Sequence, residues 1–171
     1  MNDKDLQRLI MGTLAPSMPA GVALARNYQP KQEGTPSIPA VYFVKIGDRR
    51  YGHPSRRDVW DTEQGVFVHT ERQVYISTYQ FQATEPTSQE LTASDILNTV
   101  SGIIQSDKIL SAFLAAGVGV QRVTDVRNPY IVDEHDQFEA VPSFDIVLSH
   151  WRDTVASVPA AVALEINIGR V

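Results

Sequence analysis

The sequence of 171 residues contains no cysteine, which excludes disulfide scaffolds, thiolate zinc sites and cysteine nucleophiles. Long hydrophobic runs are missing too, since no stretch approaches the roughly 18 apolar residues of a membrane span. The first 14 residues carry Asp3, Lys4, Asp5 and Arg8 and lack the apolar stretch of a signal peptide. We therefore expect a globular protein that neither crosses nor binds a membrane and is made in the cytoplasm.

The familiar motifs of enzyme active sites are also absent. The sequence contains no GxSxG, no HExxH and neither of the glycine-rich phosphate-binding patterns. The four histidines are His53, His69, His135 and His150. No two of them are three or four residues apart, the spacing that metal ligands on one helix face would have. We predict no catalytic residue, no metal site and no cofactor.

What the sequence does contain suits one domain rich in strands. Leu, Ile, Val and Phe make up 47 of the 171 residues, enough for a core, and Val plus Ile outnumber Leu about three to one. The net charge is −5, which argues against a dedicated nucleic-acid-binding protein. We expect a single domain over residues 1–171.

Apolar periodicity predicts a helix at the N-terminus that is capped by Asn2 or Asp3 and ended by Pro16 and Pro19. Residues 22–28 and 40–46 are apolar enough to predict strands. Residues 29–39 and 47–65 are polar or rich in proline and glycine, so we expect extended loops or arms there. The apolar face of the first helix consists of Leu6, Leu9, Ile10 and Leu14.

The remaining sequence predicts a long strand to about residue 83, a helix capped by Ser94, and a short helix from Ser106–Asp107 to Gly117. Three strands follow, over residues 118–127, 142–151 and 160–169. This order predicts an α+β fold, with a mainly antiparallel or mixed sheet and helices packed on one side. The expected core includes Ile96, Leu97, Val100, Ile103, Ile104, Ile109, Leu110, Phe113, Leu114, Phe144, Ile146 and Leu148.

Charge is unevenly distributed along the chain. Residues 45–57 hold five of the 15 basic residues and one acid, whereas residues 133–139 hold four acids and no Lys or Arg. These segments are either two solvated loops of opposite sign or complementary contacts between copies, which close into a ring. The candidate interface is Lys45, Arg49, Arg50, Tyr51, Arg56, Arg57, Trp60, Asp133, Glu134, Asp136 and Glu139.

Three segments together resemble the tail-terminator or neck-terminator proteins of long-tailed bacteriophages. They are VYFVKIGDRRYGHP at residues 41–54, ERQVYISTYQFQA at residues 71–83, and residues 105–150, where Pro-Ser-Phe-Asp opens a strand. The resemblance covers most of the chain from residue 41 onward. It rests on the order and spacing of aromatic, glycine and charged positions.

The resemblance implies a structural virion protein with a compact α+β fold and no catalysis. Such proteins assemble as a ring, usually of six subunits, on the last ring of the tail tube. They stop tube growth, contact the neck or head-completion proteins and sometimes the sheath, and let DNA pass through the lumen. It implies a location in the virion tail or neck, after assembly in the host cytoplasm.

Three alternatives remain open. The first is another head–tail joining protein of the neck or head-completion type. The second is a small metal-dependent hydrolase that uses Asp133, Asp136 and a histidine, although a solvated acidic turn is the better explanation of those residues. The third is a nucleic-acid-binding module that uses residues 45–57.

Overall fold

Five strands form one twisted sheet in the order β1–β2–β3–β7–β4. The computed structural model describes residues 1–26, 38–84, 91–132, 138–140 and 142–159. Strand β1 pairs in parallel with β2, and all other neighbours in the sheet are antiparallel. The strands are β1 (Ala23–Arg26), β2 (Ala40–Asp61), β3 (Val66–Thr84), β4 (Val118–Val123) and β7 (Ser143–Pro159). Two short strands, β5 (Tyr130–Val132) and β6 (Phe138–Ala140), form a separate hairpin.

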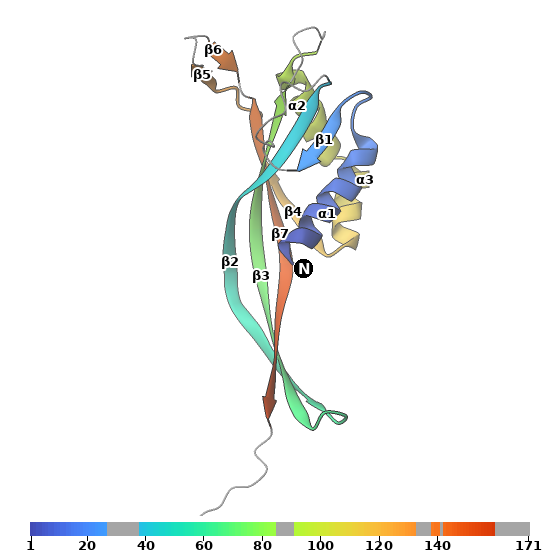
Figure 1. The fold of residues 1–171 in the computed structure, drawn as a ribbon, viewed down its shortest axis with the longest axis vertical. Coiled ribbons are helices and arrows are strands. Elements are labelled where there is room, and N and C mark those ends of the chain that lie inside the picture. The colour runs from blue at the N-terminus through green and yellow to red at the C-terminus, as the bar shows by residue number, and fades with distance from the viewer. Residues whose placement is uncertain (27–37, 85–90, 133–137, 141, 160–171) are drawn as a thin grey trace, which may run out of the picture.

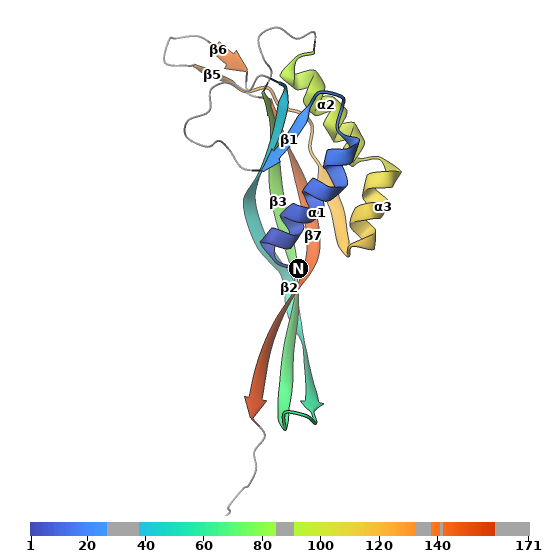
Figure 2. The ribbon, with the colours of Figure 1, turned by 45° about the vertical axis from the view of Figure 1, so that its right-hand side comes forward.

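Three helices lie on one side of the upper half of the sheet (Figures 1 and 2). They are α1 (Asp3–Leu14), which continues into the 3-10 turn η1 (Ala15–Ser17), α2 (Ala93–Ile104) and α3 (Asp107–Ala115). Asn2 and Thr92 begin α1 and α2 with reciprocal capping boxes, which satisfy amide groups that the first turn leaves free. Beyond α3, Gly117 adopts a φ of 75°, a conformation that favours glycine and directs the chain into β4.

The core lies between these helices and the sheet. Phe43, Phe81 and Phe144 occupy one row across β2, β3 and β7. Their rings stack with centroid distances of 5.6 Å and 5.1 Å. The helices contribute fully or almost fully buried side chains to the same core, among them Leu6, Ile10, Leu14, Ile96, Leu97, Val100, Ile104, Ile109 and Phe113.

Strands β2, β3 and β7 extend well beyond the helices as a three-stranded projection (Figures 1 and 2). We call residues 51–61, 66–74 and 151–159 the blade. No helix of the described chain covers it, and every residue from Trp151 to Val158 is exposed. At its tip a turn joins β2 to β3, in which Gly65 has a φ of 64°. The N-terminal ammonium of Met1 donates a hydrogen bond of 2.8 Å to Trp151 O, where the helix-covered region ends.

The α+β class, with a mainly antiparallel sheet and helices on one side, is confirmed. The prediction of a loop over residues 47–65 is wrong, because β2 continues to Asp61 and only four residues turn. Two irregularities interrupt the pairing of β2 with β3: the first leaves Ile46 without a partner between Lys45 and Gly47, and the second accommodates Gly52 and Pro54 between Tyr51 and Ser55. Gln73 Nε2 donates to Tyr51 O (2.6 Å) and to Gly52 O (3.1 Å), so the second irregularity keeps its backbone acceptors satisfied.

Several predicted boundaries also shift. The cap of α2 is Thr92 rather than Ser94, because its hydroxyl accepts from the Asp95 amide. The strand expected over 118–127 ends at Val123, and the strand expected over 142–151 runs to Pro159. Leu114 was expected in the core, but its side chain is 73% exposed. The face of α3 that packs on the core is formed by Ile109 and Phe113, which lie four residues apart. The strand predicted over 160–169 and most of the loop predicted over 29–39 lie outside the described residues. No helix of the described segments is long and apolar enough to cross a membrane.

Candidate interaction surface

All seven basic and aromatic candidates of the predicted interface lie on β2. Pairing with β3 divides them between the two faces of the sheet. Lys45, Arg50, Arg56 and Trp60 pair with the β3 positions whose side chains point to the helix side. Arg49, Tyr51 and Arg57 point to the opposite side.

Lys45 differs from the other six because its side chain is only 15% exposed. Its ammonium donates to Asp3 of α1 at 2.8 Å and also to Asp48. Burial opposes its charge, but the hydrogen bonds to the two carboxylates outweigh burial and raise the pKa of Lys45. The pKa of Asp3 is lowered, chiefly by the hydrogen bond from Lys45. Lys45 therefore fixes α1 to the sheet and is not an exposed contact.

A buried polar group lies next to Lys45 and joins three strands. Ser77 Oγ donates to Asp48 Oδ1 at 2.5 Å and lies 3.0 Å from His150 Nε2. Tyr79 Oη and His150 Nδ1 are buried without a hydrogen-bond partner among the described residues. Burial lowers the pKa of His150 and raises the pKa of Tyr79, so both rings stay neutral near pH 7. Because Ser77 is fully buried, the group links strands and presents no nucleophile at the surface.

On the helix side of the blade, charged residues form a continuous chain. Arg56 Nε donates to Glu71 Oε1 at 2.9 Å, and His69 Nε2 lies 3.5 Å from the same oxygen. His69 Nδ1 also contacts Asp58 Oδ1 at 2.5 Å. The hydrogen bond to Asp58 is the main cause that raises the pKa of His69, and the one from His69 is the main cause that lowers the pKa of Glu71. These contacts fix the side chains of β2 to β3.

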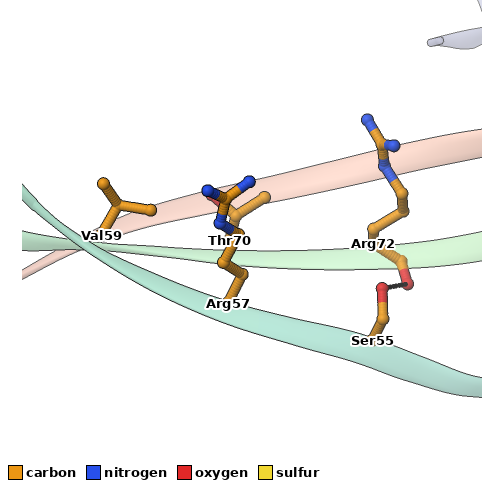
Figure 3. Close-up of a pocket in the computed structure, with 5 residues that line it drawn as sticks. All are labelled: Ser55, Arg57, Val59, Thr70 and Arg72. Carbon is orange, nitrogen blue, oxygen red and sulfur yellow. Dashed lines mark hydrogen bonds between the residues drawn. The ribbon is translucent and has the colours of Figure 1, made fainter.

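The opposite face of the blade carries a shallow hollow between β2 and β3 (Figure 3). Ser55, Arg57, Val59, Thr70 and Arg72 line it, and the side chains project to one side of the strands. Ser55 Oγ donates to Arg72 O at 3.3 Å, which helps to hold the strands together below the irregularity of β2. The hollow is open to solvent, and its lining combines the guanidinium groups of Arg57 and Arg72 with the apolar side chain of Val59.

Large exposed apolar side chains concentrate on the long strands. Of the eleven such residues in the described chain, eight lie on β2, β3 or β7. Trp60 packs edge-on against Phe67 with a centroid distance of 5.0 Å, and both rings remain more than 40% exposed. Exposed apolar clusters are typical of interaction surfaces. The eight are Ile46, Tyr51, Val59, Trp60, Phe67, Trp151, Val155 and Val158.

The predicted interface residues include none from β3 or β7. Glu71, Arg72 and Trp151 have no special spacing, and only the pairing of the strands brings them beside β2. One signal in the sequence could have indicated that the last strand continues past residue 151, namely the mixture of polar and apolar residues that follows it. It has no clear alternation, because both faces are exposed there.

The acidic candidates are not brought to the blade. Asp133, Glu134 and Asp136 lie outside the described residues, as does His135. Glu139 belongs to β6, at the end of the molecule opposite the blade tip (Figure 1). Among the described residues, no three His, Asp or Glu side chains are grouped so that they could hold a metal ion.

Comparison with known proteins places this geometry in context. The family model of the E217 gateway protein gp29 matches residues 7–160. A solved structure, the sheath/tube terminator of the extracellular contractile injection system PVC in its extended state, matches with a TM-score of 0.51 and 10% identity. The match covers the whole of this chain and 64% of the PVC chain, so this chain spans less than two thirds of that protein. No curated protein matches the sequence. The family match confirms the resemblance to phage terminator and neck proteins, and the PVC likeness confirms the fold.

Proposed function

We propose that this chain, because it belongs to the family of the E217 gateway protein gp29, is a structural virion protein that ends the tail tube and joins the tail to the neck. The observation that carries the proposal is the family match over nearly the whole chain. The PVC protein of similar fold is described as a sheath/tube terminator. The exposed apolar and charged blade supplies the surface that assembly needs.

The copies form a ring of six, the number that the resemblance implies, with the blades arranged around a lumen. Its partners are the tail tube protein, a neck or head-completion protein and, in a contractile tail, the sheath. Genomic DNA passes through the lumen without specific binding, and the net charge of −5 discourages adhesion to phosphates. The ring resides in the virion after assembly in the host cytoplasm, binds no membrane and catalyses no reaction.

The two charged segments serve different partners in this proposal. Arg56 and Arg57 of β2 lie on the blade and Arg49 and Arg50 directly precede it, whereas Glu139 lies on the hairpin at the other end (Figure 1). Neighbours at the same height in a ring do not bring these ends together. Arg49, Arg50, Tyr51, Arg56, Arg57 and Trp60 therefore contact the neighbouring copy or the tube, and Asp133, Glu134, Asp136 and Glu139 contact the next ring toward the head.

Charge reversal on the blade tests this assignment. Arg56→Glu combined with Arg57→Glu is expected to abolish rings in negative-stain images and to leave the far-ultraviolet circular dichroism of the monomer unchanged. Arg8→Glu combined with Lys108→Glu is the matched control. It changes the net charge by the same amount as the blade variant, but its two positions lie on α1 and α3. Rings of normal yield from the blade variant would exclude this part of β2 from the contact.

A further inference from the structure

We propose that neighbouring copies join by continuing the β-sheet, with the outer edge of β7 in one copy pairing with the outer edge of β2 in the next. This inference rests on the ring of the proposed function and specifies its contact. The paired segments are residues 153–159 of β7 and residues 55–61 of β2. Repetition around the ring closes the blades into one continuous barrel wall.

The first support is that both edges are open in the single chain. Strand β1 covers the outer edge of β2 only over Ala40–Phe43. Strand β4 covers the outer edge of β7 only between Ile146 and His150. Within the described chain, each strand therefore leaves a row of backbone amide and carbonyl groups unpaired along the blade. Long open edges of this kind pair readily with another strand.

The second support is that the two open segments match in height, length and direction. Ser55 and Asp153 both pair with Arg72, while Asp61 and Pro159 both pair with Val66. Each segment is thus seven residues long and lies at the same level. Because β2 and β7 are both antiparallel to β3, they run in the same direction. Rotation about an axis along the strands keeps that direction, so the new pairing is parallel.

The third support is the chemistry of the side chains on the two edges. On the face opposite the helices, β2 presents Arg57 and Val59, and β7 presents Asp153 and Val155. A stagger of two residues between copies places Arg57 beside Asp153 and Val59 beside Val155. That register pairs opposite charges and covers two side chains that are 46% and 62% exposed. Closed barrels require such a stagger between strands.

The lack of cysteine allows a clean crosslinking test on the ring. Val155→Cys is combined in turn with Val59→Cys, Arg57→Cys or Ser55→Cys. The side chains at all four positions point to the same face of the sheet. Inside one chain these positions are separated by β3, so their Cα atoms are roughly 9–10 Å apart or more, too far for a disulfide. A disulfide therefore forms only between copies. Each single cysteine variant serves as the control, since head-to-tail contacts place no two identical cysteines together.

After mild oxidation of assembled rings, the Val59→Cys/Val155→Cys variant is expected to give a ladder of covalent multimers up to the full ring. The other two registers are expected to crosslink at least about fivefold less. Absence of a ladder in all three registers, from rings that form normally, would overturn the sheet continuation and leave the ring intact. Efficient dimers from Val155→Cys alone would also overturn it, since they indicate two-fold pairing of β7 with β7. If wild-type protein gave no rings by native mass spectrometry, with or without tail tubes, the proposed function itself would fail and this contact with it.

Discussion

Arg72 of β3 and Asp153 of β7 form a two-bond ion pair across the blade, with Nε–Oδ1 at 2.8 Å and Nη2–Oδ2 at 3.0 Å. The guanidinium also lies 5.9 Å from the ring centroid of Trp151. No helix of the described residues covers this part of the sheet, so side-chain contacts across the strands add to the backbone pairing of β3 with β2 and β7. The ion pair stiffens β7 at the start of its open edge.

Asp153→Asn is expected to loosen β7 locally, because a neutral amide cannot pair with both guanidinium nitrogens as a carboxylate does. Amide hydrogen exchange in residues 153–159 should become faster, while the midpoint of thermal unfolding changes little, since the pair is exposed. Unchanged exchange in this segment would show that backbone pairing with β3 alone holds the strand. The variant Asp125→Asn, outside the blade, is the control.

Phe144→Ala is expected to lower the free energy of unfolding by about 3–5 kcal/mol, because it leaves a cavity where two rings stack. Chemical denaturation followed by circular dichroism measures the change. Phe67→Ala, on the exposed blade, is the matched control and should cost far less. Equal losses for both variants would contradict the division between core and surface described above.

Lys45→Ala is expected to destabilise the monomer by about 1.5–3 kcal/mol, since it removes charge-assisted hydrogen bonds to Asp3 and Asp48. Arg49→Ala, four positions along the same strand and exposed, should change stability by less than about 0.5 kcal/mol. Denaturant titration of the two variants gives the comparison. An unchanged free energy of unfolding in Lys45→Ala would show that these hydrogen bonds do not stabilise the fold, and Lys45 would again be a candidate interface residue.

The pKa values of two histidines are expected to depart in opposite directions from the ordinary value of 6.5. The pKa of His69 is raised, so its ion pairs stabilise the fold fully below about pH 6.5 and are lost as the pH rises through the raised value. The pKa of His150 is lowered, so the stability that its neutral ring supports is present above about pH 6.5 and is lost as the pH falls. Proton NMR titration resolves the two rings. A midpoint for His150 above that of His69 would contradict the structure.

Trp60→Ala is expected to weaken assembly by about tenfold or more while leaving the monomer folded, since large aromatic side chains dominate interface energies. Analytical ultracentrifugation over a concentration series measures the loss. Leu114→Ala is the control, because that side chain is also large, apolar and exposed but lies on α3. A similar loss in the control would show that the interface extends over the helices.

The fold class was predictable because core residues follow regular periods. Leu6, Ile10 and Leu14 mark one helix face, and Phe144, Ile146 and Leu148 mark one strand face. The blade was not predictable, because period-2 alternation appears only where one face of a strand is buried and the other is wet. From Gly47 to Asp61 both faces are exposed, and glycine and proline at the irregularities imitate a loop. The charged residues of β2 were found as candidates, but their partners on β3 and β7 follow only from the pairing of the strands.

Growth of tail tubes in the presence of this protein tests the central claim most directly. Tubes polymerised from the tail tube protein are imaged by cryo-electron microscopy with and without the chain. The account predicts one ring at a single end of each tube and an end to elongation once that ring is bound. Tubes of unchanged length distribution, with no added density at either end, would contradict it.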